Sequence, residues 1–77
     1  MTFHLLDTVV LERDLPAHSL ECGDLGVVVQ LYDPDGLEVE FVSASGKTEA
    51  LVTLTVHDVR HVMDTDLIAV RRLRRSA

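Results

Sequence analysis

The chain has 77 residues, 47% of them hydrophobic, and a net charge of −6. This length fits one small domain, the hydrophobic content excludes a disordered chain, and the single cysteine excludes an internal disulfide. Aromatic residues make up only 4%, which disfavours functions that need an aromatic platform for bases or proline-rich peptides. The charge is uneven, because residues 1–70 carry −10 and residues 71–77 (RRLRRSA) carry +4.

The N-terminal segment has no features of a secretion signal. Its apolar run lacks a basic flank and meets Asp7 early, so we expect no signal peptide. No apolar stretch approaches the roughly 20 residues of a membrane helix. We therefore expect a cytoplasmic protein without a membrane partner.

Strands are predicted along most of the chain. Residues 4–11 (HLLDTVVL) are aliphatic and β-branched, and favour a first strand. Residues 12–24 contain Pro16 and Gly23 and predict a long loop. Three further strands are predicted at residues 25–32, 37–42 and 48–55. Their inward residues are predicted to be Val27, Val29 and Leu31, then Leu37, Val39 and Phe41, then Ala50, Val52 and Leu54.

The turns between these strands predict a register. Residues 33–36 (DPDG) suit a type I turn with a G1 bulge, which places Leu31 opposite Val39. Residues 43–46 suit a four-residue loop, which places Val39 opposite Ala50. Both registers pair apolar with apolar residues, so the meander is consistent with a single buried face.

The remaining chain completes the fold prediction. Residues 56–60 favour a 3₁₀ turn and residues 61–63 a short closing strand. A long first loop, a three-stranded meander, a 3₁₀ turn and a short last strand together predict a mainly β domain, a five-stranded SH3-like barrel over residues 1–63.

Residues 64–77 predict a short C-terminal helix. Asp64 or Thr65 is a candidate N-cap, Asp66 is an acidic first-turn residue, and arginines close the segment. Its apolar stripe consists of Leu67, Ile68, Val70 and Leu73. We expect this stripe to pack on its own barrel, on a second copy or on a partner protein. As a further alternative, the basic end is suited to lie against the acidic body, within the chain or across a dimer.

Several stretches resemble a family of short bacterial proteins catalogued as a domain of unknown function. They are LLDTVVLERDLP (5–16), GDLGVVVQLY (23–32), LEVEFVSASGKTEALVTLT (37–55) and HDVR (57–60). The resemblance covers roughly residues 3–62. It implies an SH3-like barrel and an accessory protein encoded beside a larger one, as in toxin–antitoxin or immunity pairs, and fold alone does not determine function.

Three residue patterns raise chemical alternatives. His57 and His61 have H-x₃-H spacing, to which Cys22 or Asp58 would add a metal ligand, but a short turn does not align positions four apart. Cys22 with His18 as a base lacks an oxyanion donor cluster and a third orienting residue. Gly23 and Gly26 lack the Lys-Ser/Thr and helix of a phosphate loop, and favour a tight strand entry and close packing.

The charges indicate a binding surface rather than an active site. The carboxylates lie at turns or outward positions, where burial does not raise a pKa for acid–base catalysis. An acidic surface fits a basic partner, whereas a body at −10 repels nucleic acid. The predicted partner-binding residues are Asp33, Asp35, Glu38, Glu40, Leu67, Ile68, Val70, Leu73, Arg71, Arg72, Arg74 and Arg75.

We therefore predict a non-catalytic protein-interaction module without metal or cofactor. Its expected setting is an accessory, antitoxin-like or immunity-like partner of a larger protein, with a homodimer through residues 64–77 as a further expectation. One alternative is a nucleic-acid-associated barrel that uses the arginine-rich tail. Another is a subunit or activator of a metalloenzyme.

Overall fold

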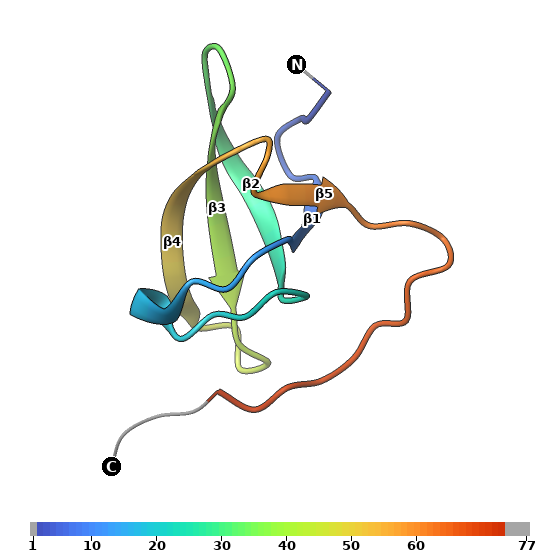
Figure 1. The fold of residues 1–77 in the computed structure, drawn as a ribbon. Helices are drawn as coiled ribbons and strands as arrows, with labels where there is room; N and C mark the ends of the chain where they lie inside the picture. The colour runs from blue at the N-terminus through green and yellow to red at the C-terminus, as the bar shows by residue number, and fades with distance from the viewer. Residues whose placement is uncertain (1, 74–77) are drawn as a thin grey trace.

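One antiparallel sheet organises the chain. The structure, a computed structural model, describes residues 2–73. Its strands within this range are β1 (Thr8–Leu11), β2 (Leu25–Tyr32), β3 (Gly36–Val42), β4 (Thr48–Thr55) and β5 (Val59–His61), and Pro16–His18 form a 3₁₀ turn, η1. The strand order is β4-β3-β2-β1-β5 (Figure 1). The prediction of a mainly β fold with five strands is confirmed.

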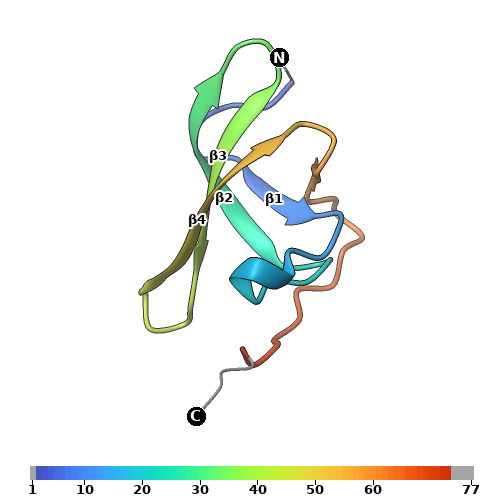
Figure 2. The same ribbon diagram turned by 60° about the vertical axis from the view of Figure 1, so that its left-hand side comes forward.

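The sheet is open, with β4 and β5 at its two edges. Figure 2 shows how the long strands of the meander twist past the shorter β1, as expected from the twist of adjacent strands. Within residues 2–73 no hydrogen-bonded pairing joins β4 to β5, so closure into an SH3-like barrel stays a prediction.

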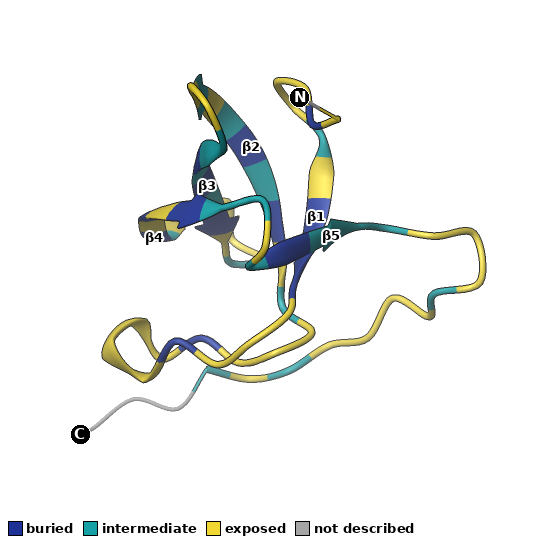
Figure 3. Ribbon diagram, turned by 45° about the horizontal axis from the view of Figure 1, so that its top comes forward, coloured by how far each residue is buried: buried dark blue, intermediate teal, exposed yellow. Residues whose placement is uncertain are grey.

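The core lies on one face of the sheet. β3 alternates as predicted, with Leu37, Val39 and Phe41 buried, because side chains of a strand point to opposite faces in turn. β4 contributes the predicted Ala50, Val52 and Leu54. Phe3, Leu15 and Leu20 add to this core from outside the strands, so the long loop after β1 contributes to the core (Figure 3).

On β2 the predicted inward face is partly wrong. Leu31 packs against the core, but Val28 is fully buried whereas Val27 and Val29 are only half-buried. The register shifts between Val28 and Gln30. Such a bulge adds one residue to β2 and exchanges the faces that its residues present beyond that point.

Both predicted registers are displaced by two residues over part of each strand pair, and a register shift changes the displacement between Val28 and Gln30 and between Phe41 and Val42. Leu31 pairs with Leu37 instead of Val39, and Val39 pairs with Val52 instead of Ala50. The Asp33–Pro34 peptide in the first turn is cis. A displacement of two residues keeps every side chain on its face, since the period of a strand is two. The same apolar residues therefore meet, although with other partners.

The ends of the predicted elements move as well. β1 starts at Thr8 and not at residue 4, because residues 4–7 form a turn in which the Asp7 carboxylate accepts the His4 N–H at 2.8 Å. β5 starts at Val59, two residues before the predicted strand, and residues 56–58 form a turn that is not 3₁₀.

The predicted C-terminal helix is wrong for the described part of residues 64–77. Residues 64 and 65 form a turn, and residues 66–73 are neither helix nor strand. The segment runs along the outside of the sheet to the end where the β3–β4 turn lies (Figures 1 and 2). Arg74 and Arg75 lie outside the described residues. No helix in residues 2–73 is long and apolar enough to cross a lipid bilayer.

Candidate functional site

The C-terminal segment, residues 64–73, borders an apolar groove. The groove has a volume of about 600 Å³, and the sheet side of its lining includes Val10, Leu25 and Val42. Val10 pairs with Leu25 on β2. Val10 is 7% exposed although it does not belong to the core cluster. Its burial therefore arises on the opposite face of the sheet, where the C-terminal segment passes.

An ion pair at Asp66 fixes the start of this segment. Arg60 on β5 donates to both carboxylate oxygens of Asp66, at 2.8 Å to Oδ2 and 2.9 Å to Oδ1. The Met63 N–H donates to the same carboxylate at 2.7 Å, and the Asp66 N–H donates to the Met63 carbonyl oxygen at 3.0 Å. The Arg60 hydrogen bond, followed by that from Met63, lowers the pKa of Asp66 to about 2.

These contacts explain why the predicted helix does not start here. Asp66 closes a turn with Met63 and binds Arg60, whereas the prediction placed it in the first turn of a helix. A helix of this length is marginal in water unless its apolar stripe is packed. Its candidate stripe is not packed in the described structure, because Leu67 is 93% and Val70 99% exposed.

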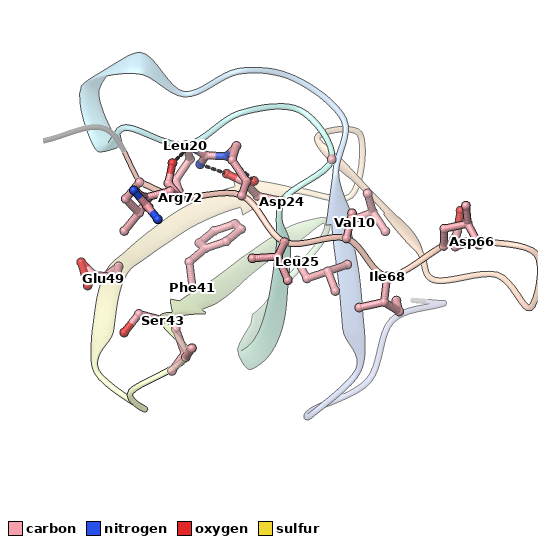
Figure 4. A pocket seen from close by; sticks show the side chains of 18 of the residues that line it. Val10, Leu20, Asp24, Leu25, Phe41, Ser43, Glu49, Asp66, Ile68 and Arg72 are labelled. Carbon is pink, nitrogen blue, oxygen red and sulfur yellow. Dashed lines mark hydrogen bonds and ion pairs between the residues drawn. The ribbon is translucent and has the colours of Figure 1, made fainter.

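A second ion pair holds the far end of the segment. Arg71 donates to Asp24 through Nε at 3.0 Å and through Nη2 at 2.6 Å. Nη2 also donates to the Ser19 carbonyl oxygen at 3.2 Å, and Nη1 lies 3.3 Å from Glu21 Oε2. Figure 4 shows Asp24 beside Leu20 at the edge of the groove. The predicted contact between the basic end and the acidic body is thus found at Arg71.

The pKa of Asp24 reflects this environment. Burial raises the pKa of its carboxyl group, but the hydrogen bond from Arg71, the Glu21 N–H and the Arg71 charge together lower it below its ordinary value. Arg71 in turn has its pKa raised, chiefly by the hydrogen bond to Asp24. The pair is therefore charged on both sides at neutral pH.

The loop that carries Asp24 is ordered by its own hydrogen bonds. Leu15 and Leu20 exchange backbone hydrogen bonds at 2.9 and 3.2 Å. The Gly23 N–H donates to the Leu11 carbonyl oxygen at 2.7 Å, and Gly23 has a φ of +98°, a conformation that glycine adopts without strain. The Asp24 carboxylate accepts the Glu21 N–H at 2.8 Å. The loop therefore brings Ser19, Glu21 and Asp24 together through its own backbone contacts and the Asp24 side chain.

The structure gathers only part of the predicted partner-binding set. Leu67, Ile68, Val70, Arg71, Arg72 and Leu73 all line the groove. Asp33 and Asp35 lie in the β2–β3 turn, at the other end of the sheet (Figure 1). Glu38 and Glu40 point outward from β3, where they accept hydrogen bonds from the hydroxyls of Thr53 and Thr48 on β4.

Sequence reasoning missed the residues that hold the segment. The sequence analysis counts Asp24, Glu21 and Arg60 only in the net charge of residues 1–70. Ser19 contributes its backbone carbonyl oxygen, and a side-chain pattern does not predict a backbone contact. The excess of arginine after residue 70, beside an acidic body, was the sequence feature that predicted a contact for Arg71. Net charge predicts attraction between two regions but does not identify the carboxylate that accepts the guanidinium.

The metal-ligand candidates are engaged in other contacts. The Asp58 carboxylate accepts hydrogen bonds from Arg13 at 2.7 Å and from the Thr55 N–H at 2.9 Å. His61 stacks on Phe3, with ring centroids 4.3 Å apart, and His57 is exposed in the turn before β5. Among residues 2–73 no three histidine, cysteine or acidic side chains are grouped so that they could hold a metal ion.

The two glycines have the structural role that the sequence predicted. Gly26 is buried in β2, and a Cβ there would lie 2.5 Å from Val39 Cγ1, so only glycine lets the strands pack this closely. Gly23 provides the turn into β2. Cys22 is exposed, and its N–H donates to the Asp14 carboxylate at 2.8 Å.

Comparisons with known proteins bear on the family alone. No curated protein and no solved structure matches the chain. One family model, described as Domain of unknown function (DUF4926), matches residues 5–61. This range contains all five strands and the loop with Ser19, Glu21 and Asp24, and leaves the C-terminal segment outside. The chain belongs to the family described as Domain of unknown function (DUF4926).

Proposed function

We propose that the protein is a non-catalytic interaction module that binds a larger, basic protein. The observation that carries this proposal is the C-terminal segment itself. Leu67 and Val70 are more than nine-tenths exposed, yet the segment is tied to the body by Asp66 on one side and Arg71 on the other. A tethered row of exposed apolar side chains beside an apolar groove is a surface that a partner would cover.

The energetics favour such a partner. Burying apolar surface stabilises a complex by about 25 cal/mol per Å² before the costs of association are subtracted. Because the pair of Asp66 with Arg60 restricts the segment, less conformational freedom is lost on binding. The charge of −10 on residues 1–70 adds a long-range attraction for a basic partner.

The biological setting that we propose follows the resemblance noted in the sequence. It is an accessory protein, antitoxin-like or immunity-like, whose partner is encoded nearby. The strand order, with β5 beside β1 and a meander of β2 to β4, supports the proposal that the sheet is a variant of the SH3-like barrel.

A pull-down with the full chain tests the function. We expect the wild-type protein to capture a basic protein from native lysate, and Leu67→Asp/Val70→Asp to lose it. Leu5→Asp is the matched control, because Leu5 is also exposed but precedes β1 and does not line the groove, and this variant should still capture the partner.

Two results would contradict the proposal. One is capture that the double substitution leaves unchanged. The other is recovery of nucleic acid rather than protein at low salt, with loss when Arg71, Arg72, Arg74 and Arg75 are replaced by alanine, which would favour the nucleic-acid alternative.

A further inference from the structure

The site that holds Arg71 is built by residues far from it in sequence. Its acceptors are the Ser19 carbonyl oxygen and the carboxylates of Glu21 and Asp24, which we call the arginine site. Ser19 has a φ of 58°, and its N–H donates to the Pro16 carbonyl oxygen at 3.1 Å. The Asp24 N–H donates to the Glu21 carbonyl oxygen at 3.0 Å. These backbone contacts, with the hydrogen bond from the Glu21 N–H to the Asp24 carboxylate, hold the Ser19 carbonyl oxygen and the Asp24 carboxylate by bonds that do not involve Arg71.

The geometry of the arginine site selects a guanidinium group. Asp24 accepts from Nε and Nη2 of one planar group, at 3.0 and 2.6 Å, which is the two-bond pattern that arginine forms with a carboxylate. The third acceptor, the Ser19 carbonyl oxygen, receives a second hydrogen bond from Nη2. A lysine ammonium is a compact donor and cannot reproduce this fork.

The C-terminal segment is held at the arginine site chiefly through the Arg71 side chain. Between Asp66 and Arg71 its side chains contribute little to burial, since Leu67, Ile68 and Val70 are 93%, 68% and 99% exposed. The Arg71 side chain keeps 28% of its surface exposed and that of Asp24 keeps 18%, so the two-bond pair with Asp24 is the main contact at the site. A second guanidinium that makes the same two bonds can exchange with Arg71. The loop is thus the fixed part of the site and the Arg71 side chain is the replaceable part, while the pair of Asp66 with Arg60 keeps the start of the segment in place.

We propose that the arginine site binds an arginine side chain of the partner, and that Arg71 fills the site within the chain until the partner displaces it. The ligand is an extended peptide segment in which apolar residues precede the arginine, as residues 67–70 precede Arg71. The apolar residues would enter the groove beside Val10 and Leu25. This inference rests on the proposed function and names the partner residue that is recognised.

Charge decides between a basic partner and a second copy of the chain. A second copy would bring the same segment, but it also carries a net charge of −6, and bodies of like charge repel. A basic partner supplies the arginine and is attracted over a longer range. The proposal therefore commits to a basic partner.

The test uses full-length protein and a peptide that copies residues 66–75, DLIAVRRLRR. Arg71→Ala empties the arginine site, and we expect this variant to bind the labelled peptide at least tenfold more tightly than wild type in a fluorescence anisotropy titration. Arg13→Ala is the charge-matched control, because Arg13 pairs with Asp58 and does not line the groove, and it should leave the affinity at the wild-type level. The peptide DLIAVARLRR, which lacks the first arginine, should lose the binding.

A second set of variants tests the acceptors. Asp24→Asn combined with Arg71→Ala should reduce peptide affinity at least tenfold relative to Arg71→Ala alone. Since Asp24 also accepts the Glu21 N–H, Glu21→Gln in the same background serves as the milder variant, with a smaller loss. Circular dichroism verifies that each variant is folded.

Three outcomes would overturn the inference: no peptide binding to folded Arg71→Ala protein, equal binding to both peptides, or a wild-type dimer in sedimentation equilibrium that Arg71→Ala abolishes. The last would assign the site to a second copy. Failure here is distinct from failure of the proposed function, because the pull-down depends on Leu67 and Val70 and not on the arginine site. A partner captured without peptide binding would retain the function and remove this site.

Discussion

Two regions without strands differ sharply in how they are held. The loop between β1 and β2, residues 12–24, buries Leu15 and Leu20 in the core and orders itself by backbone hydrogen bonds. The C-terminal segment, residues 64–73, has a comparable number of apolar residues but leaves Leu67 and Val70 exposed. It is fixed chiefly by the side chains of Asp66 and Arg71.

The difference shows that apolar content alone does not decide which irregular segment packs. Both ends of the loop are held by paired strands of the same sheet, so the further entropy cost of bringing the loop against the sheet is small. Its leucines therefore lie next to the core. The C-terminal segment is joined to a strand only at β5. Ordering each of its residues costs conformational entropy, which new contacts must offset. The core face of the sheet is already covered, so few such contacts are available to this segment.

The largest expected effect comes from the buried side of this comparison. Leu20 is 4% exposed within the core cluster. Leu20→Ala should lower the free energy of unfolding by about 2–5 kcal/mol, because it removes buried apolar surface and leaves a cavity. Urea denaturation followed by circular dichroism measures the change. Leu20→Met preserves volume and should cost less than about 1.5 kcal/mol, and a loss as large as that of alanine would contradict the packing account.

A smaller and local effect is expected from acid. The folded-state pKa of Asp66 is about 2, below the ordinary value of 3.8, so the stabilisation by its ion pair is present above pH about 4. It is lost as the pH falls through about 2. The carboxyl carbon resonance of Asp66 in an NMR titration should have its midpoint near 2. Arg60→Gln removes the largest cause of the shift and should raise that midpoint, and an unchanged midpoint would contradict the assigned pairing.

The smallest effect is expected at the exposed side of the comparison. Leu67→Ala should change the free energy of unfolding by no more than about 0.5 kcal/mol, because Leu67 is 93% exposed and loses no packing. The measurement is the same urea titration, with Leu20→Ala as the reference. A loss above 1 kcal/mol would show that the segment packs in solution and would remove the contrast between the two regions.

The faces of the sheet were more predictable than its pairing. Alternation assigned the buried residues of β3 and β4 correctly, because burial follows a period of two. The bulge between Val28 and Gln30 follows a run of three valines, in which no alternation of apolar and polar residues indicates the inward face. The inward face of β2 was therefore partly misassigned. The registers failed by two residues because turn sequences allow several loop lengths, and all of those that preserve the faces bury the same side chains.

The candidate site was only half predictable for a related reason. The sequence places apolar residues and arginines together at positions 67–73, which indicated an interaction segment. It also contains helix signals at Asp64, Thr65 and Asp66. These local signals did not prevail, because Arg60 lies six residues before Asp66 and binds its carboxylate across the turn.

Length, composition and alternation by themselves determined a small, mainly β domain with an acidic body and a basic end. They did so because the alternation of apolar residues and the net charge are properties of the sequence and do not depend on which residues meet in the fold. Only the tertiary structure decided that Arg71 meets Asp24, 47 residues away, and that residues 66–73 stay extended. Both depend on where the β1–β2 loop places its acceptors, since hydrogen bonds between remote residues require positions that only the folded sheet provides.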